Sequence, residues 1–354
     1  MISVNILTQG FDTPNGLSLL FPIIVFKNKL NKKYRIKIFS NITEKLDDCD
    51  VLIIESKYFK NKWKAFNHQI IEQFKIWRRK KIKIIFCDTT DSSSWIKSDI
   101  LDFVDKYAKG QLLKNKELYL NKIYGDRIYA DYYFKSKKVK DKDFQFSKPL
   151  KPNQLKKLCL SWNSGLSNYS LFSPIIYRYI PIKLSYFFFK FSDSFVIPNL
   201  SKKIINCRFG SAYHLESIKY QRDQIKKILK DHVKTEKLNR ILYFKEMRKT
   251  MISVVPFGYG EITLKDFESF MNGCILAKPS LNHMDTWPDF YIEDKTYIPF
   301  SWDLLDIIEK IEMIKNNYTK YMDIAVNGQK IYRKFTTGKD AADLFMEQFQ
   351  KLIS

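Results

Sequence analysis

The chain has few cysteines, and none of them stands in a metal-binding pattern. Its 354 residues include five cysteines, at positions 49, 87, 159, 207 and 274. They form no CxxC pair, so the sequence indicates no zinc site. Three of them fall in strand-like apolar runs, where a free thiol packs as a small apolar side chain. This usage is typical of a reducing cytoplasm.

Long hydrophobic runs are also missing. No segment approaches the roughly 20 apolar residues that a membrane-spanning helix needs. The N-terminal sequence MISVNILTQG has no basic stretch followed by a long apolar core, so we expect no signal peptide. The most apolar region, residues 171–197, is interrupted by Arg178, Lys183, Lys190 and Asp193. We therefore expect a cytoplasmic protein whose region 171–197 contacts an anionic membrane surface peripherally.

Arginine is scarce and acidic residues are outnumbered. The net charge is +23, but only ten of the 61 basic residues are Arg. Nucleic-acid readers favour Arg for bidentate contacts, and no nucleic-acid-binding motif is present. Local basic runs occur only at residues 78–83 and 135–142. The sequence therefore predicts no specific nucleic-acid partner, and it leaves a solvated Lys-rich surface and an anionic membrane contact as the two interpretations.

Several catalytic motifs are absent. The sequence has no Walker loop and no Gly-x-Ser-x-Gly elbow, so kinase and hydrolase activities lack a motif. The DTTD sequence at residues 88–91 has the wrong spacing for a metal-binding DXD motif. We therefore expect no metal and no cofactor.

The length and the element pattern predict two domains of one class. A chain of 354 residues is more than one core usually organises. Strands alternating with helices imply parallel sheets with right-handed crossovers. We predict an α/β fold with two Rossmann-like domains, residues 1–197 and 198–354, joined by a hinge within 195–202. The expected strands are residues 2–7, 34–39, 51–55, 82–87, 158–162, 204–208, 242–244, 253–256 and 274–277; residues 102–133 read as helix and connections; the expected helices include residues 17–29, 64–79, 217–229, 302–315, 317–334 and 341–353.

Residues 253–297 carry the clearest functional pattern in the chain. An apolar strand leads into Phe257-Gly258-Tyr259-Gly260, where glycines allow close approach of a ligand. Thr263 then caps a helix, and Gly273 ends it. A glycine loop that opens into a helix N-terminus is an anion-binding arrangement.

Glu268 lies on the apolar face of that helix, four residues after Leu264. A carboxylate there needs a partner, because burying an unpaired charge is costly. One interpretation is an internal salt bridge. The other is that its two oxygens accept hydrogen bonds from neighbouring hydroxyls of a ribose.

This stretch resembles the donor-binding segment of GT-B glycosyltransferases. Those proteins carry one Glu beside the glycine loop and a second on the following helix. Here they are Glu261 and Glu268, with six residues between them where seven are usual, followed by Gly273. Residues 278–289 also resemble bacterial surface-polysaccharide transferases. The resemblance implies a nucleotide sugar on the C-terminal domain, an acceptor on the N-terminal domain, no metal, and a last helix that packs back on the first domain.

Candidate site residues follow from this resemblance and from the loops. The donor candidates are Arg208, Arg222, Gly258, Tyr259, Gly260, Glu261, Lys265 and Glu268. For Lys265 a surface role is the alternative. Asp88, Asp91 and Asp12 follow predicted strands and are candidate catalytic bases, with turn formation as the alternative. His283 is a candidate contact to the leaving diphosphate or the sugar.

The predicted function is transfer of a sugar from a nucleotide-sugar donor to a surface-glycan or lipid-linked acceptor, as in polysaccharide, capsule or lipopolysaccharide biosynthesis. The alternative is a catalytically inactive protein of the same fold that binds sugar nucleotides or glycans. In either case the loop at residues 88–94 is expected to face the loop at residues 257–261 across a cleft, since each follows the carboxyl end of a strand.

Overall fold

The computed structural model describes residues 1–60, 62–143 and 145–354, and its first domain is built on a parallel sheet. The strand order is β2-β1-β3-β4-β5-β7, and every neighbouring pair is parallel. The strands are β1 (Ile2–Leu7), β2 (Tyr34–Phe39), β3 (Val51–Glu55), β4 (Lys83–Asp88), β5 (Lys106–Lys109) and β7 (Leu158–Leu160). Such a sheet is buried on both faces, and all five residues of β3 are buried accordingly.

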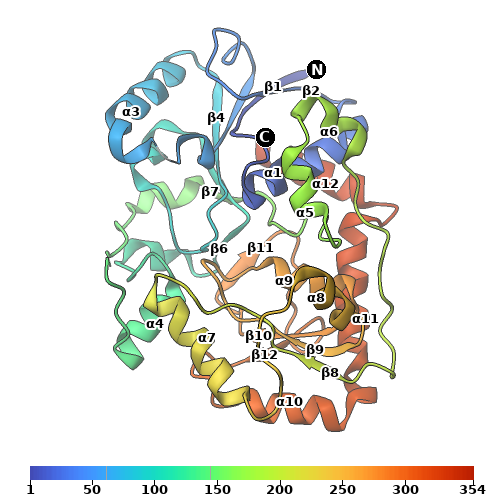
Figure 1. Cartoon of the computed structure of the whole chain (residues 1–354). Coiled ribbons are helices and arrows are strands. Elements are labelled where there is room, and N and C mark those ends of the chain that lie inside the picture. The colour runs from blue at the N-terminus through green and yellow to red at the C-terminus, as the bar shows by residue number, and fades with distance from the viewer. Residues whose placement is uncertain (61, 144) are drawn as a thin grey trace.

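Helices cover both faces of this sheet. Alternate residues of each strand point to opposite faces, so Ile53 packs with helix α1 (Pro14–Val25), whereas Leu52 packs with helix α3 (Trp63–Arg79). Helix α12 (Ala341–Ile353) joins the α1 side. Figure 1 shows α3 on one side of the sheet and α1 with α12 on the other.

The second domain has a smaller parallel sheet, in the order β12-β10-β9-β8. Its strands are β8 (Ile204–Asn206), β9 (Thr250–Val254), β10 (Ile275–Pro279) and β12 (Ile298–Phe300). Helix α9 (Leu264–Met271) connects β9 to β10, and its Phe267 and Met271 belong to the core that also contains α1 and α12. Helices α7 (Glu216–Leu229) and α10 (Ile307–Asn316) pack on the other face.

The remaining elements connect and cover these sheets. Strands β6 (Gln111–Leu113) and β11 (Met284–Thr286) pair antiparallel and so join the two domains. The other helices are α2 (Lys27–Leu30), α4 (Ile128–Lys137), α5 (Ser173–Ile176), α6 (Ile182–Phe188), α8 (Arg240–Met247) and α11 (Tyr318–Thr336), with 3₁₀ turns η1 (Ser56–Phe59), η2 (Ser98–Phe103), η3 (Lys116–Leu120), η4 (Pro152–Lys157) and η5 (Tyr177–Tyr179). No helix in these described ranges is both long enough and apolar enough to cross a bilayer.

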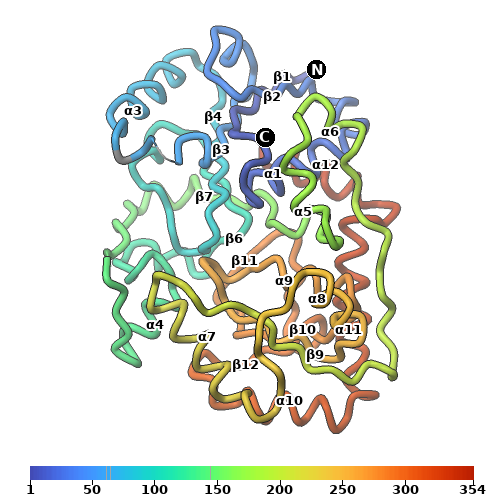
Figure 2. Tube along the Cα trace, in the orientation of Figure 1, coloured from blue at the N-terminus to red at the C-terminus, as the bar shows by residue number. Residues whose placement is uncertain are grey.

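The C-terminal helix returns to the first domain. The trace in Figure 2 climbs through α11 from the second domain and ends in α12 close to the N-terminal sheet. Phe345 packs edge-on against Trp162 at 4.9 Å, and Phe349 against Tyr34 at 5.3 Å. These contacts match the packing that the family resemblance implied for the last helix. The domain boundary at 197/198 lies between the two sheets and remains our proposal.

The predicted class, two Rossmann-like α/β domains in a GT-B arrangement, is confirmed by this topology. One predicted strand is wrong: residues 242–244 belong to helix α8, which Asn239 caps by accepting a hydrogen bond from the Leu242 amide. Four strands were missed. β5 and β6 lie within residues 102–133, where the two lysines of β5 hid the apolar signal of a buried strand. β11 and β12 have three residues each, too few for a clear pattern.

Candidate active site

A cleft of about 910 Å³ lies between the two domains. Thr13 after β1 and Asp91 after β4 belong to its N-terminal wall, and Gly258 after β9 belongs to its C-terminal wall. The carboxyl ends of both sheets therefore open into the same space, which is where ligands of open parallel sheets bind. Its lining comprises Thr13, Pro14, Asn15, Lys57, Lys60, Asp91, Ser164, Phe209, Gly210, Ser211, Ala212, Tyr213, Arg222, Lys237, Gly258, Tyr259, Gly260, Ile262, Thr263, Leu264 and Lys265.

The cleft is strongly basic. Five cations line it, two from the first domain and three from the second, against a single carboxylate, that of Asp91. The cations are Lys57, Lys60, Arg222, Lys237 and Lys265. A cavity with this charge balance attracts an anionic ligand, because low-dielectric walls focus the field of like charges.

Arg222 is a buried cation without a carboxylate partner in the described chain. Its side chain extends from α7 and is only 6% exposed. The guanidinium donates to the carbonyls of Phe257 (2.8 Å) and Gly210 (2.6 Å) and stacks on the Tyr213 ring at 4.7 Å. Burial lowers the pKa of Arg222 from its ordinary value. A buried guanidinium held by carbonyls alone keeps a full positive charge for an anion in the cleft.

In the glycine loop, close packing rather than left-handed backbone requires a glycine at position 260. A Cβ on Gly260 would lie 1.8 Å from the Asp91 carbonyl oxygen, whereas a Cβ on Gly258 would meet nothing closer than 3.7 Å. At the start of α9, the Asp266 carboxylate accepts from the Thr263 amide at 3.1 Å, which is half of the predicted capping box. Gly273 follows the C-terminal end of α9 and has φ +59°, as predicted from its sequence position.

Lys265 and Glu268 lie on α9 and line a second pocket of about 510 Å³ that shares Lys265 with the main cleft. Glu268 is 4% exposed and accepts from Arg240 at 3.2 Å, so the ion pair anticipated as its structural alternative is present. Lys265 stacks on the Tyr243 ring at 3.7 Å. Burial lowers the pKa of Lys265 to about 8; Glu268 opposes that shift, and two neighbouring arginines add to it.

Arg208 is committed to carboxylates. It forms a two-pronged contact with Glu246 at 3.0 and 2.9 Å and a third contact with Glu236 at 3.0 Å. The hydrogen bonds that Arg208 donates to Glu246 are the main cause that raises the pKa of Arg208. Arg208 lines the second pocket, but its charge is already neutralised there, and its role as a donor contact stays a prediction.

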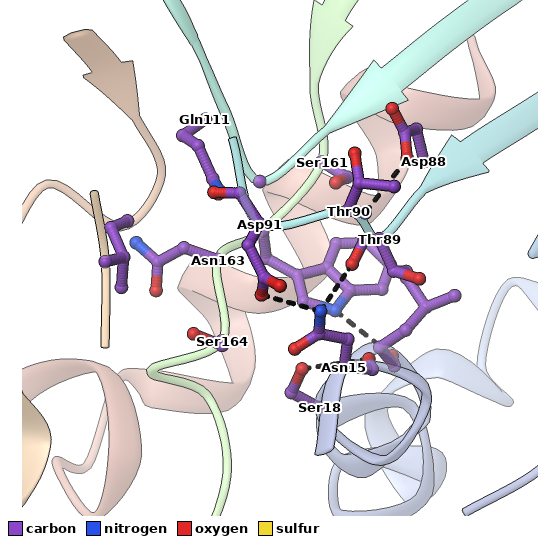
Figure 3. A pocket seen from close by; sticks show the side chains of 14 residues that line it. Asn15, Ser18, Asp88, Thr89, Thr90, Asp91, Gln111, Ser161, Asn163 and Ser164 are labelled. Atoms are coloured by element: carbon purple, nitrogen blue, oxygen red, sulfur yellow. Dashed lines mark hydrogen bonds between the residues drawn. The ribbon is translucent and has the colours of Figure 1, made fainter. Parts of the chain in front are cut away.

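Asp91 is the carboxylate that faces the cleft. The Asn15 amide donates to Asp91 Oδ1 at 2.9 Å and to the Thr89 carbonyl at 2.7 Å, as Figure 3 shows. Asp91 is partly exposed and lines both the main cleft and a small adjoining pocket that Gln111 and Asn163 also line. It therefore has a free face toward any ligand between the domains.

The other two aspartates are placed differently. Asp88 is buried and pairs with Lys109 at 2.7 Å, and neither side chain has any exposed area. Burial raises the pKa of Asp88, but the charge and hydrogen bond of Lys109 outweigh that effect and hold it below its ordinary value. Asp12 is exposed, and its backbone carbonyl accepts a hydrogen bond from Arg178. Asp88 thus supports the loop that carries Asp91, and Asp12 lies at the rim.

Glu261 and His283 connect the domains behind the cleft. The buried Glu261 carboxylate accepts from the Ser93 amide at 3.0 Å and the Ser93 hydroxyl at 2.6 Å. His283 Nε2 lies 3.5 Å from Glu261. Burial raises the pKa of Glu261, but His283 and the two Ser93 bonds together bring it below its ordinary value. The expectation that residues 88–94 face residues 257–261 is confirmed by these contacts.

Sequence reasoning missed several cleft residues. Lys57 lies in η1, Lys60 directly follows η1, and Lys237 lies in the connection before α8. Asn15, at the start of α1, positions Asp91. With 61 basic residues in the chain, no local pattern distinguished these lysines; only the preference for residues after strands could have pointed to Asn15. Tyr259, predicted at the donor site, lines the cleft with its hydroxyl 3.0 Å from His214.

Within the described residues no three His, Cys, Asp or Glu side chains gather closely enough to hold a metal ion. The expectation of metal-independent chemistry stays a prediction.

Fold and cleft together define a two-domain α/β protein with a basic cleft at the carboxyl ends of both sheets. No protein-family model and no curated protein matches the chain.

Several solved structures align with nearly the whole chain, among them the following three. HepE from Anabaena, solved with UDP-glucose, aligns over 99% of both chains with 11% identity and a TM-score of 0.45. A glycosyltransferase from Rickettsia africae covers 99% of this chain and 98% of its own, with 7% identity and a TM-score of 0.46. Sucrose-phosphate synthase from Thermosynechococcus elongatus covers 99% of both chains, with 10% identity and a TM-score of 0.45. At these scores the likeness carries no argument, and function is inferred from the site alone.

Proposed function

We propose that this chain is a glycosyltransferase that moves a sugar from a nucleotide-sugar donor to a surface-glycan or lipid-linked acceptor. The observation that carries the proposal is the interdomain cleft, in which Arg222, buried and without a carboxylate partner, lies beside the glycine loop and the start of α9. A nucleoside diphosphate is the anion that fits a buried Arg, flanking lysines and a helix N-terminus.

In this proposal the second domain binds the donor. Arg222 and Lys265 contact the diphosphate, and Leu264 and Lys265, the first residues of α9, present their amides to the cleft. The ribose reaches the second pocket, where Glu268 accepts from its hydroxyls in place of, or together with, Arg240. Arg208 holds the wall of that pocket through Glu246. The diphosphate needs no metal when these cations neutralise it.

The first domain then positions the acceptor. In the transfer step an acceptor hydroxyl forms a bond to the anomeric carbon, the bond from that carbon to the diphosphate oxygen breaks, and the nucleoside diphosphate leaves with both electrons. Asp91, oriented by Asn15, takes the hydroxyl proton. Arg222 and Lys265 stabilise the negative charge that develops on the leaving oxygen. His283 acts indirectly, since it contacts Glu261 rather than the cleft.

The alternative is an inactive protein of the same fold that binds sugar nucleotides or glycans. The enzyme and a sugar-nucleotide binder both predict that nucleotide sugars stabilise the protein, because a ligand that binds only the folded state raises the melting temperature. A thermal-shift panel of UDP-, GDP-, CMP- and dTDP-sugars tests binding. Release of free nucleotide in the presence of purified glycan or lipid-linked acceptors then separates the enzyme from the binder. Stabilisation by none of the panel would contradict both the enzyme and the sugar-nucleotide binder, and would leave a glycan binder as the alternative.

Glu268→Gln tests the ribose contact. We expect this variant to bind the best donor of the panel at least about tenfold more weakly in calorimetry, because an amide replaces one of two acceptor oxygens. Arg240→Gln is the matched control, since it removes the ion pair but leaves the carboxylate. If Glu268→Gln binds like the wild type, Glu268 is only the ion-pair partner of Arg240.

A further inference from the structure

An exposed apolar surface with basic residues lies on α5, η5 and α6, and is called the α5–α6 surface below. Tyr179 is 82% exposed and Phe187 is 80% exposed, although large aromatic side chains are usually buried. The exposed apolar side chains of the surface are Phe172, Ile175, Ile176, Tyr179, Leu184, Phe187 and Phe188. A concentration of this kind within 17 consecutive residues marks an interaction surface.

The exposure is built into the fold, because the inner side of the segment is well packed. Phe189 stacks on Phe21 of α1 at 5.1 Å and contacts Phe11 at 4.8 Å. Ser185 of α6 is also buried. Residues 183, 184, 187 and 188 have the helical spacing of one outward face. Figure 1 shows α5 and α6 on the outside of the N-terminal domain, next to α1.

The charged side chains of the segment that forms this surface are all basic. Arg178, Lys183 and Lys190 are exposed, and Lys27 of α2 reaches the Tyr186 ring at 4.5 Å. Residues 167–192 contain no Asp or Glu. A second copy of the chain is a poor partner, because a two-fold contact would bring the same cations together and the chain carries a net charge of +23. The complementary partner is apolar at its centre and anionic at its edge, as a bilayer surface is.

The surface also lies beside the cleft. Arg178 donates to the Asp12 carbonyl, and the next two residues, Thr13 and Pro14, line the cleft. We propose that the α5–α6 surface docks on an anionic lipid bilayer, with its aromatic side chains in the interface and its cations against acidic headgroups. The inference rests on the proposed function for its purpose: a lipid-linked acceptor whose lipid stays in the bilayer would present its headgroup at the cleft.

Vesicle flotation tests the docking. At low salt we expect the full chain to float with phosphatidylcholine vesicles containing about one third phosphatidylglycerol and to stay behind with pure phosphatidylcholine, because anionic lipid attracts Lys and Arg near the surface. Tyr179→Ser with Phe187→Ser should lower the bound fraction at least about tenfold through the lost apolar burial. Lys183→Glu should weaken binding to the anionic vesicles specifically.

Two controls keep the outcome decisive. Leu305→Ser removes an apolar side chain that is 85% exposed elsewhere, and Lys330→Glu makes the same charge change on α11; both should float like the wild type. Equal flotation of the α5–α6 variants and the controls, or no flotation at all, would overturn the proposal. So would a dimer in light scattering that Tyr179→Ser with Phe187→Ser dissolves, since the occupant would then be a second copy. Melting-temperature shifts with nucleotide sugars, measured on the same variants, report the donor site separately, so the docking can fail while the proposed function stands.

Discussion

At the residue scale, two buried arginines differ in whether a carboxylate neutralises their charge. Arg208 and Arg222 are 8% and 6% exposed, so burial alone does not distinguish them. Arg208 has two carboxylates, whereas Arg222 contacts backbone carbonyls and aromatic rings but no carboxylate among the described residues. A buried cation whose charge is neutralised contributes to stability, and one whose charge is not neutralised is available to a ligand. The two residues should therefore respond differently to the same substitution.

Arg222→Gln should lower donor affinity by about tenfold to a hundredfold, the range of a lost charge-assisted hydrogen bond, with a small effect on melting temperature. Arg208→Gln should instead lower the free energy of unfolding by roughly 3 kcal/mol, because it leaves the half-buried Glu246 without its partner. Calorimetry with the best donor and urea unfolding on both variants are the measurements. If Arg222→Gln binds the donor as tightly as the wild type, the diphosphate does not contact Arg222.

At the element scale, helix α9 links the proposed donor site to the hydrophobic core. Its buried residues, including Phe267 and Met271, fix the helix on its sheet, and its first turn borders the cleft. Lys265 lies in that first turn. Because its positive charge is partly suppressed by burial, the charge state of the cleft depends on pH near neutrality.

The pH dependence follows from the lowered pKa of Lys265, about 8. Below that pH the ammonium is present and attracts the diphosphate; above it the neutral amine does not. Donor affinity should fall about tenfold between pH 7 and 9.5, as expected for the loss of one nearby charge in a partly buried site. Calorimetry across this range on wild type and Lys265→Met checks it. The Lys265→Met variant should bind the donor weakly, with an affinity that does not change over this pH range. If its affinity falls with pH as the wild type's does, the titrating group is not Lys265.

The glycine loop offers a test of packing between domains. Gly260→Ala should lower the free energy of unfolding by about 2 kcal/mol, because its methyl group would overlap the Asp91 carbonyl and the two loops must separate. Gly258→Ala is the control, since its nearest neighbour is at 3.7 Å. Thermal unfolding of both variants is the measurement. Equal melting temperatures would mean that the two loops are not in contact in solution.

The sequence identified elements that have a local signal. Alternating strands and helices, the Thr263 cap and the Gly273 stop were readable because each depends on neighbours in the chain. Helix α8 was misread because residues 242–244 are apolar and aromatic, which favours a strand in isolation. Lys109 was missed for a different reason. It ends β5 inside the core, and only its pairing with Asp88 on the neighbouring strand makes that position tolerable. Pairing across strands cannot be read from a single sequence.

At the scale of the whole molecule, the domains are held together at several points behind the cleft. Strands β6 and β11 pair across the junction, Ser93 binds Glu261, and Asp141 accepts from the Ser217 amide at 2.8 Å. These contacts bring the loop after β4 against the loop after β9. Asp91 of the first domain and Arg222 of the second domain therefore line the same cleft. The proposed transfer from donor to acceptor needs both residues.

Asp91→Asn should separate binding from turnover. We expect turnover to fall at least about a hundredfold, the usual contribution of a general base, with donor affinity changed less than about threefold. The fold should persist, since the Oδ1 of an Asn at this position can still accept the hydrogen bond that the Asn15 side chain donates. Asp88→Asn is the matched comparison on the same loop. It should cost roughly 3 kcal/mol of stability, because Lys109 has no exposed area and loses its only ion pair in the described chain. Single-turnover rates and donor affinities for both variants decide the assignment. If Asp88→Asn abolishes turnover at full stability while Asp91→Asn remains active, the general base is Asp88 rather than Asp91. The acceptor would then have to reach Asp88 from the side of strands β4 and β5.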